Sequence, residues 1–304
     1  HWPTRRDLEL IAVTGTNGKT SVATFTRQIW AALGHEAINI GTTGVEGAFS
    51  APSSHTTPDP VTLHRKLCDA AAAGVTHAAM EASSHGLDQR RLDGVRLVAA
   101  GFTNLTQDHL DYHHTMEAYL AAKAGLFTRL LPEDGVAVVN LDGAHGSDIA
   151  ELALNLGLRV LTVGKGQGAD LQIAATRPDA RGQEVRYLWQ GQAHQTRLNL
   201  IGAFQAENVA VAAGLALAAG APPEAVLSVL PKLTGVRGRM QLAATRKNGA
   251  SVFVDYAHTP DAIETALKAL RPHVMGRLII AFGAGGDRDT TKRPLMGAAA
   301  RANA

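Results

Sequence analysis

Short apolar runs alternate with longer segments of helical periodicity through the first half of the chain. Six runs predict buried strands, at residues 8–13, 36–40, 75–81, 97–102, 136–140 and 159–163. The spacing of apolar positions predicts helices from Val22 to Leu33 and over residues 61–73, 116–131 and 147–156. This alternation predicts an α/β fold whose mostly parallel sheet is covered by helices on both faces.

The pattern changes in the second half of the chain. Residues 170–200 are rich in β-formers and broken by turns, which predicts a small antiparallel sheet. Two Ala-rich helices are expected at 203–219 and 223–230. Residues 235–239 are predicted to be a hinge, followed by strands at 252–255 and 278–282, a helix at 261–270 and another from Pro294. We expect a P-loop central domain at 1–237 and the start of a second, Rossmann-like α/β domain at 238–304. Both ends of the sequence suggest truncation, so we expect the complete protein to be longer.

Composition and charge exclude some classes of protein. The 304 residues carry a formal net charge of +2, which provides no basic surface for nucleic acid or an anionic membrane. The longest apolar stretch, residues 209–221, is too short to span a bilayer, and no signal peptide is visible. Cys68 has no second cysteine with which to form a disulfide, which fits a reducing compartment. We expect a cytoplasmic monomer that binds neither nucleic acid nor membrane.

One glycine-rich stretch has a clear chemical meaning. Thr14-Gly15-Thr16-Asn17-Gly18-Lys19-Thr20-Ser21 lies between the first predicted strand and the first helix. In that context the N–H groups that start the helix bind phosphate, the lysine reaches the terminal phosphates, and the threonine hydroxyl ligates Mg²⁺. The general phosphate-loop pattern has glycine at position 13, where this chain has Val13. The alternative is a glycine turn that carries a surface lysine.

Two polar clusters, at residues 81–91 and 103–114, follow predicted strands at their carboxyl ends, where ligands bind in open α/β sheets. A third polar cluster, at residues 55–60, precedes a predicted helix. Glu81 stands where a second Mg²⁺ ligand is expected, and the alternative is an ordinary carboxylate at a helix N-terminus. The histidines of these clusters suggest zinc only weakly, because no thiolate or H-E-x-x-H helix accompanies them. A hard cation beside ATP, held by Glu81 and one histidine, is the better interpretation. By periodicity alone, Lys123 is a solvated lysine.

Eight motifs, in order along nearly the whole chain, resemble those of the Mur ligases. These are the ATP-dependent amide-bond-forming enzymes of peptidoglycan precursor synthesis. The motifs are T-G-T-N-G-K-T-S (14–21), H-T-T-P (55–58), E-A-S-S-H-G-L-D-Q-R-R (81–91), F-T-N-L-T-Q-D-H-L-D-Y-H (102–113), A-Y-L-A-A-K (118–123), G-A-F-Q-A-E-N (202–208), D-Y-A-H-T-P-D (255–261) and G-G-D-R-D-T-T-K-R-P-L-M-G (285–297). The resemblance implies ATP and Mg²⁺ as cofactors. It also implies UDP-N-acetylmuramoyl-L-alanyl-D-glutamate and a diamino acid as partners.

The resemblance assigns roles residue by residue. Catalysis is assigned to Lys19, Glu81, His109 and Lys123, of which Lys123 matches the family's carbamylated lysine. ATP is assigned to Gly15, Thr16, Asn17, Gly18, Lys19, Thr20, Ser21, Asn208, Arg239 and Asp255, and Mg²⁺ to Thr20, Glu81, His109 and the carbamate of Lys123. The muramoyl dipeptide is assigned to Thr56, Thr57, Ser83, Gln89 and Arg91, with His258 nearby. Arg288 is assigned to a carboxylate of the incoming amino acid.

The implied reaction forms an amide bond through an acyl phosphate on the γ-carboxylate of D-Glu. Gly-Gly-Asp-Arg-Asp at 285–289 favours meso-diaminopimelate, with lysine and ornithine open. Because the family's UDP-binding domain and the rest of its C-terminal domain are absent, we expect this segment by itself to be inactive. One alternative is a folylpolyglutamate synthase-like ligase, against which H-T-T-P and S-S-H-G-L-D-Q-R-R argue. The other is a P-loop nucleotide-binding module that is not a ligase, in which Lys123 and Arg288 would have no role.

Overall fold

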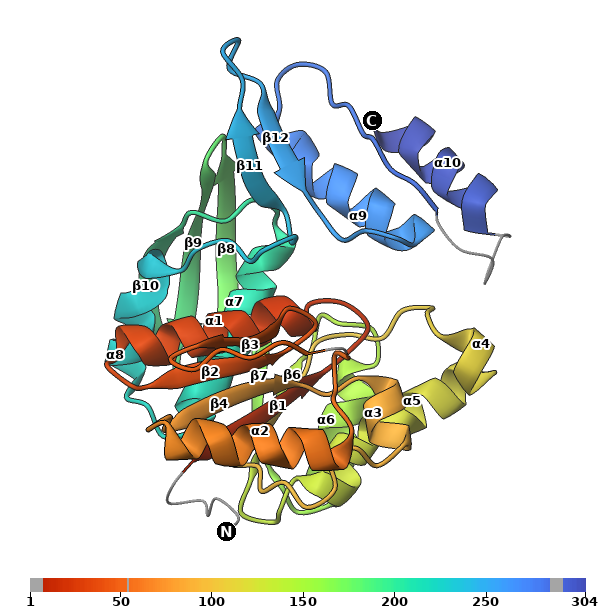
Figure 1. The fold of residues 1–304 in the computed structure, drawn as a ribbon. Helices are drawn as coiled ribbons and strands as arrows, with labels where there is room; N and C mark the ends of the chain where they lie inside the picture. Colours follow the sequence, from red (N-terminus) through yellow and green to blue (C-terminus); the bar gives the residue numbers. More distant parts are fainter. Residues whose placement is uncertain (1–7, 54, 285–291) are drawn as a thin grey trace.

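The structure, a computed structural model, describes residues 8–53, 55–284 and 292–304. Within them lies a ten-stranded sheet of order β10-β9-β8-β7-β6-β5-β1-β4-β2-β3 (Figure 1). Its strands are β1 Glu9–Thr14, β2 Ala37–Gly41, β3 Gly44–Gly47, β4 His77–Glu81, β5 Ala99–Phe102, β6 Val136–Asn140, β7 Arg159–Gly164, β8 Leu171–Asp179, β9 Gly182–Trp189 and β10 Gln192–Leu198.

The six strands predicted for the first half of the chain are confirmed to within two residues at each end. From β2 to β8, following the order of the sheet, each neighbouring pair of strands is parallel. The predicted antiparallel strands are β8, β9 and β10. Because β8 also pairs with β7, they extend the main sheet and do not form a separate one. The short strand β3, which was not predicted, pairs antiparallel with β2 at the other edge.

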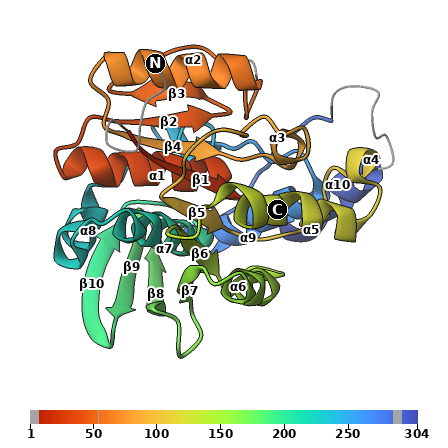
Figure 2. The ribbon, with the colours of Figure 1, turned by 90° about the horizontal axis from the view of Figure 1, so that it is seen from below.

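The two faces of the sheet bury different side chains. On β1, Ile11 and Val13 belong to one hydrophobic core, and Leu10 and Ala12 belong to the other. The first core includes side chains of α1 (Lys19–Ala32), α7 (Phe204–Ala218) and α8 (Pro223–Val229), and the second includes side chains of α2 (Pro60–Ala72), α5 (Met116–Gly125) and α6 (Gly146–Asn155) (Figure 2). Since helices cover both faces, the central strands are apolar almost throughout.

Capping side chains fix where several helices begin. Asp59 accepts a hydrogen bond from the backbone N–H of Thr62 at 3.0 Å at the start of α2. Thr115 does the same for Ala118 at 3.1 Å, so α5 begins at Met116. The predicted helix 116–131 is present, but its last turn is the wider π-helix η1 (Leu126–Leu130). Two short helices that line the carboxyl end of the sheet, α3 (Ser84–Asp88) and α4 (Leu110–His113), were not predicted.

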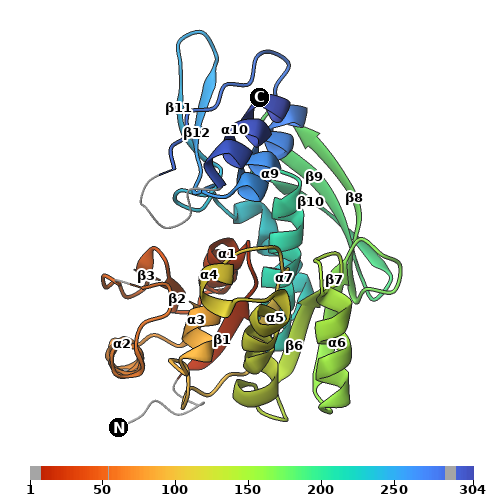
Figure 3. The same ribbon diagram turned by 90° about the vertical axis from the view of Figure 1, so that its right-hand side faces the viewer.

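A second unit follows the central sheet (Figure 3). After the 3₁₀ turn η2 (Leu230–Lys232), it consists of β11 (Gln241–Thr245), β12 (Ser251–Val254), α9 (Pro260–Leu270), the 3₁₀ turn η3 (Arg271–His273) and α10 (Lys292–Asn303). The strands β11 and β12 pair antiparallel. Helices α9 and α10 pack together through Ile263, Leu267, Met296 and Ala300. Within the described residues, no helix is both long enough and apolar enough to cross a bilayer.

The predicted strand at residues 278–282 is wrong. These residues are described, and within the described part of the chain no strand pairs with them. Leu278 and Ile280 instead pack against the two small cores of the second unit. An apolar run favours burial of its side chains, whereas a strand also needs a hydrogen-bonded neighbour. Sequence periodicity reports the first condition and not the second.

Two histidines stack at the amino end of the parallel strands. The His77 ring lies 4.0 Å from the His35 ring and 4.9 Å from the Trp30 ring, between centroids. Burial, and to a lesser degree the nearby His35, lowers the pKa of His77 from 6.5 to about 4. Between these two pH values, the His77 imidazole is therefore protonated in the unfolded chain and neutral in the folded protein. The protein should accordingly lose stability as the pH falls from 6.5 to about 4.

We expect His77→Phe to remove about 1–2 kcal/mol of this loss in the free energy of unfolding. This value is smaller than the full pKa shift would give, because the ring is partly exposed to solvent. Phenylalanine keeps the ring contacts and cannot take up a proton. The measurement is the melting temperature across the acidic range, with His194→Phe, on the edge strand β10, as the control. An unchanged pH slope in His77→Phe would show that this pair does not set the acid sensitivity.

Candidate active site

The phosphate loop connects β1 to α1 and depends on two glycines. Gly18 caps α1 with φ +89°, a left-handed conformation that favours glycine. Gly15 has φ +146° and lies against Thr103, where an added Cβ would stand 1.9 Å from the hydroxyl oxygen. The hydroxyl of Thr103 also donates a 2.6 Å hydrogen bond to the carbonyl of Asn17. The loop is therefore held between the start of α1 and the end of β5, with its geometry fixed before any ligand binds.

Lys19 lies over the loop that precedes it. Its Nζ donates hydrogen bonds of 2.8 Å to the carbonyl oxygens of Gly15 and Thr16. Burial lowers the pKa of Lys19, and the nearby Glu81 carboxylate opposes that effect. A positive charge held at the amino end of α1 adds to the field of the helix dipole, so this region attracts anions.

Glu81 ends β4 beside the phosphate loop. In the register of the sheet it stands opposite Val13 of β1, and its side chain is only 2% exposed. The Thr20 hydroxyl donates to Glu81 Oε2 at 3.0 Å, and the Thr42 N–H donates to Oε1 at 2.8 Å. Gly41 permits this approach, since an added Cβ would lie 1.9 Å from Oε1. Burial raises the pKa of Glu81, and the nearby charge of Lys19 counteracts the rise.

Thr20 and Glu81 together present a hydroxyl and a carboxylate oxygen, which are the ligands that Mg²⁺ prefers. Their donor set therefore fits a hard cation beside a bound phosphate. His109 lines the same cavity, with its ring 4.8 Å from that of His85 and its backbone at φ +54°. In the part of the chain that the structure describes, no group of three or more His, Cys, Asp or Glu side chains could hold a metal ion. The histidine cluster thus gives no support to a zinc site.

Lys123 is in the protein interior, in contrast to its interpretation from periodicity as a solvated lysine. Its side chain is 1% exposed, and its Nζ donates a 2.7 Å hydrogen bond to the Gly15 carbonyl. The same nitrogen lies 4.5 Å from the ring centroid of Tyr119, whose hydroxyl is 3.1 Å from the Thr16 hydroxyl. Burial, together with the charge of Lys19, lowers the pKa of Lys123 well below its usual value. A lowered pKa makes the neutral, nucleophilic form of a buried amine easier to reach.

A second group of polar residues begins at Thr56 and Thr57. The Thr57 hydroxyl is 3.0 Å from the Ser83 hydroxyl, and the Ser83 N–H donates to Thr57 Oγ1 at 3.0 Å. Arg91 Nη1 donates to the Thr57 carbonyl at 2.9 Å. The Thr56 hydroxyl lies 3.0 Å from that of Thr42, which connects this group to Glu81. Hydrogen bonds therefore connect Thr56, through Thr42, and Thr57 to Glu81, and they connect Ser83 and Arg91 to Thr57.

The second unit contributes Arg239, which reaches back to the phosphate loop. Its Nη2 donates to the Thr20 hydroxyl at 3.1 Å, and its guanidinium lies 4.7 Å from the ring centroid of Tyr256. Asp255 accepts hydrogen bonds from the N–H groups of Met240 and Ala257, at 2.8 and 2.9 Å. On the opposite side, Asn208 directs its Oδ1 at Gly18, where an added Cβ would lie 2.5 Å away. These residues bring both units of the protein to the same loop.

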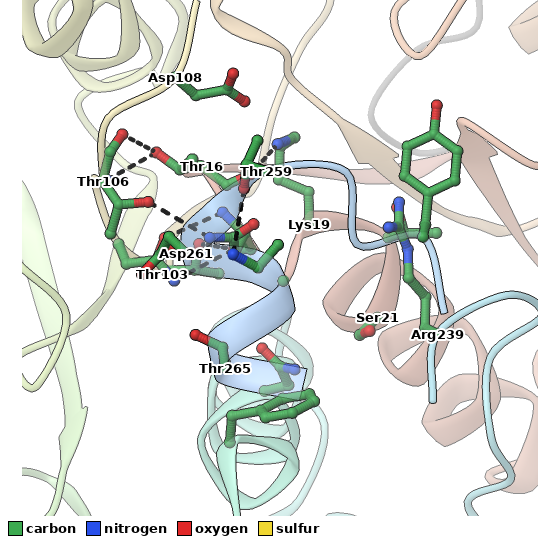
Figure 4. Close-up of a pocket in the computed structure, with 18 of the residues that line it drawn as sticks. Thr16, Lys19, Ser21, Thr103, Thr106, Asp108, Arg239, Thr259, Asp261 and Thr265 are labelled. Carbon is green, nitrogen blue, oxygen red and sulfur yellow. Dashed lines mark hydrogen bonds between the residues drawn. The ribbon is translucent and has the colours of Figure 1, made fainter. Parts of the chain in front are cut away.

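A cavity of about 510 Å³ lies between the phosphate loop and the start of α9, as Figure 4 shows with Lys19, Arg239 and Thr259 around it. Predicted site residues that line it are Thr16, Asn17, Gly18, Lys19, Thr20, Ser21, Thr56, Glu81, Ser83, His109, Asn208, Arg239, Asp255 and His258. Five others, Gly15, Thr57, Gln89, Arg91 and Lys123, are not among the residues that line it. Arg288 lies outside the described residues.

Sequence reasoning missed Thr42, Tyr119 and Tyr112, which contact predicted site residues. Thr42 directly follows β2, so the rule that ligands bind at the carboxyl ends of strands could have found it. Tyr119 lies four residues before Lys123 on α5, which puts both on one helix face. Tyr112 belongs to the polar cluster at 103–114, but the sequence does not single it out, because α4 is a short helix that pattern analysis does not detect.

A phosphate loop between β1 and α1, a buried carboxylate at the end of the neighbouring strand and a cavity bordered by a second unit define a P-loop nucleotide-binding protein of the α/β class. The chain belongs to the Mur ligase family, because residues 13–216 match the Mur ligase middle domain and residues 238–304 match the Mur ligase glutamate ligase domain.

One relative is the protein from Caulobacter vibrioides named UDP-N-acetylmuramoyl-L-alanyl-D-glutamate--2,6-diaminopimelate ligase. It is 51% identical over 295 residues, which cover 95% of this chain and 60% of the relative. A solved structure of a ligase with the same name is 40% identical with a TM-score of 0.79, covering 98% of this chain and 60% of its own. The chain thus spans about 60% of the length of these relatives.

Folylpolyglutamate synthase, the protein of the alternative considered above, shares the fold. The structure of the Mycobacterium tuberculosis enzyme complexed with ADP matches 88% of this chain and 66% of its own with a TM-score of 0.70. The two sequences are only 20% identical, so the likeness concerns the fold alone.

Proposed function

We propose that the protein is an ATP-dependent ligase of peptidoglycan precursor synthesis. It would join the D-Glu γ-carboxylate of UDP-N-acetylmuramoyl-L-alanyl-D-glutamate to meso-diaminopimelate, with lysine and ornithine as the other candidate amino acids. The observation that carries the proposal is Lys123, a buried amine whose Nζ lies 2.7 Å from a carbonyl of the phosphate loop. A P-loop module without ligase chemistry has no use for that amine. The names of the relatives agree with this choice of reaction.

The chemistry requires that a carboxylate be activated before an amine can attack it. One carboxylate oxygen would attack the γ-phosphorus of ATP, and the bond from that phosphorus to the β-bridging oxygen would break, giving an acyl phosphate and ADP. The amine would then attack the acyl carbon, phosphate would leave, and the amine would lose a proton. Lys19, held at the loop, would stabilise charge on the transferred phosphoryl group.

Thr20 and Glu81 would hold Mg²⁺, which supplies charge neutralisation to the phosphates when it is bound. His109 would complete a second cation position. The neutral amine of Lys123 would react with CO₂, forming an N–C bond and releasing one proton. The resulting carbamate would present anionic oxygens towards Mg²⁺. The depressed pKa of Lys123 supports this step, since only a neutral amine reacts with CO₂.

The remaining residues would divide between the substrates. Gly15 to Ser21 would bind the ATP phosphates, with Asn208, Arg239 and Asp255 as further nucleotide contacts. Thr56, Thr57, Ser83, Gln89 and Arg91 would bind the muramoyl dipeptide, with His258 nearby, and Arg288 would pair with a carboxylate of the amino acid. We also propose domain boundaries at 1–237 and 238–304, and a monomer that acts in the cytoplasm.

Phosphate release by the full-length gene product tests the proposal. The assay contains ATP, Mg²⁺ and UDP-N-acetylmuramoyl-L-alanyl-D-glutamate, with diaminopimelate, lysine or ornithine added in turn. We expect release with diaminopimelate, and release that depends on both the dipeptide and the amino acid. No release with any of the three amino acids would refute the ligase assignment, and release with folate and glutamate instead would favour a folylpolyglutamate synthase.

A further inference from the structure

A chain of hydrogen bonds runs from the short helix α4 to the surface that the proposed function assigns to the muramoyl dipeptide. Tyr112 of α4 donates its hydroxyl hydrogen to Asp88 Oδ2 at 2.7 Å, and Gln89 Nε2 donates to the same hydroxyl at 3.1 Å. Gln89 Oε1 accepts from Nε and Nη2 of Arg91, at 3.0 and 2.6 Å. Arg91 Nη1 finally donates to the Thr57 carbonyl at 2.9 Å.

The direction of each hydrogen bond in this chain is fixed by chemistry. An ionised carboxylate can only accept, so the single hydroxyl hydrogen of Tyr112 points at Asp88. The hydroxyl must then accept from its other neighbour, which requires the NH₂ end of the Gln89 amide to face it. The amide oxygen consequently faces Arg91, where it accepts two N–H groups of one guanidinium.

The opposite orientation of the Gln89 amide would place an NH₂ group against the guanidinium, so donor would face donor. Tyr112 prevents that rotation as long as Asp88 holds its hydrogen. The guanidinium of Arg91 is thereby held by the Gln89 amide oxygen and the Thr57 carbonyl, and its remaining N–H groups can bind an anion.

The ring of Tyr112 makes a separate contribution. It packs on His85 of α3 with centroids 4.2 Å apart and on His113 at 4.8 Å. These contacts join α4 to α3 through the body of the side chain and do not involve the hydroxyl. Replacing tyrosine by phenylalanine therefore removes the hydrogen bonds and retains the packing.

We propose that Tyr112 is a positioning residue that fixes the orientation of Gln89 and, through it, of the Arg91 guanidinium, so that the site is ready for an anionic group of the acyl substrate. This inference rests on the proposed function, which places the muramoyl dipeptide at Gln89 and Arg91. Tyr112 acts through its neighbours and makes no contact with the reacting atoms.

The test is Tyr112→Phe in the full-length enzyme. We expect the KM for UDP-N-acetylmuramoyl-L-alanyl-D-glutamate to rise about three- to tenfold, the range for losing a partly exposed hydrogen bond that orders an ion-binding group. The kcat and the KM for ATP should change by less than about twofold, since the phosphate loop is not involved. The control is Tyr187→Phe on β9, which removes a hydroxyl group that donates a 2.9 Å hydrogen bond to the Ala206 carbonyl. This variant should leave the KM for the dipeptide unchanged.

A double-mutant cycle separates positioning from a general structural role. In a Gln89→Ala background, Tyr112→Phe should cause no further rise in KM, because the group through which it acts is gone. Additive effects, an unchanged KM in the single variant, or a fall in kcat at constant KM would each overturn the inference.

The two proposals fail in different ways. If the wild-type enzyme releases no phosphate, the proposed function fails. Calorimetry without ATP then measures the Kd for the UDP-muramoyl dipeptide, which should be about three- to tenfold higher in Tyr112→Phe than in the wild-type protein. Equal Kd values for the wild-type protein and Tyr112→Phe, or no binding by either, would overturn the inference.

Discussion

Replacing Lys123 by alanine is expected to lower ligase activity by about a thousandfold or more, the largest effect of any variant considered. The side chain is 1% exposed and its amine donates a hydrogen bond to the phosphate loop, so the substitution removes the amine that would become a carbamate beside the loop. Added bicarbonate should not restore activity, because no amine remains to form a carbamate. The measurement is phosphate release with diaminopimelate as the acceptor.

The matched control is Lys232→Ala, which removes an exposed lysine of η2 and should leave activity unchanged. A direct readout is ¹³C NMR after addition of labelled bicarbonate, where the wild-type protein should show a carbamate signal that Lys123→Ala lacks. Since burial lowers the pKa of Lys123, this signal should appear near neutral pH, where an ordinary lysine is almost fully protonated. Retained activity in Lys123→Ala would exclude the carbamate.

Glu81→Gln is expected to lower activity by about a hundredfold or more and, above the acidic range, to leave the protein as stable as the wild type or more stable. The carboxylate is buried, and burial raises its pKa more than the charge of Lys19 lowers it. A carboxyl group whose pKa is raised by folding stabilises the protein below its unfolded pKa of about 4.5 and loses that contribution as the pH rises. The neutral amide avoids this cost at neutral pH but cannot donate negative charge to Mg²⁺.

The measurements are activity, the melting temperature at several pH values, and the Mg²⁺ dependence of nucleotide binding. We expect nucleotide binding by the variant to respond little to Mg²⁺, whereas the wild type binds more tightly when Mg²⁺ is added. A large fall in melting temperature at neutral pH would show that Glu81 is mainly a structural residue. Equal responses to Mg²⁺ would remove it from the proposed ligand set.

The parts of this fold that sequence could predict are those that repeat a pattern. The run Leu8 to Val13 is apolar because helices cover both faces of β1, and that condition is visible in the sequence itself. The stretch Gly15 to Thr20 is likewise recognisable, since its glycines are required by local geometry. In contrast, the strand expected at 278–282 depended on a partner strand, which is a property of the fold and not of the segment.

The candidate site divides in the same way. Glu81 could be placed from its position at the end of a predicted strand, although its contact with Thr20 required the register of β1 against β4. The burial of Lys123 could not be read from periodicity, since α5 is only weakly amphipathic and its lysine lies under the phosphate loop. Tyr112 could be placed only as a member of the polar cluster at 103–114, because its hydrogen bonds depend on where two short helices meet.

The pairing of Val13 with Glu81 constrains how the gene can change. Along β4, Ala78 and Met80 face the core that includes α2, while Ala79 faces the core that includes α1. Alternation then turns Glu81 to the side of α1, where the Thr20 hydroxyl stands. A single codon gained or lost within β4 would turn the carboxylate to the opposite side of the sheet. The same change in the surface loop after α2 could be absorbed, so lineages of this protein should tolerate length variation there and exclude it from the strand.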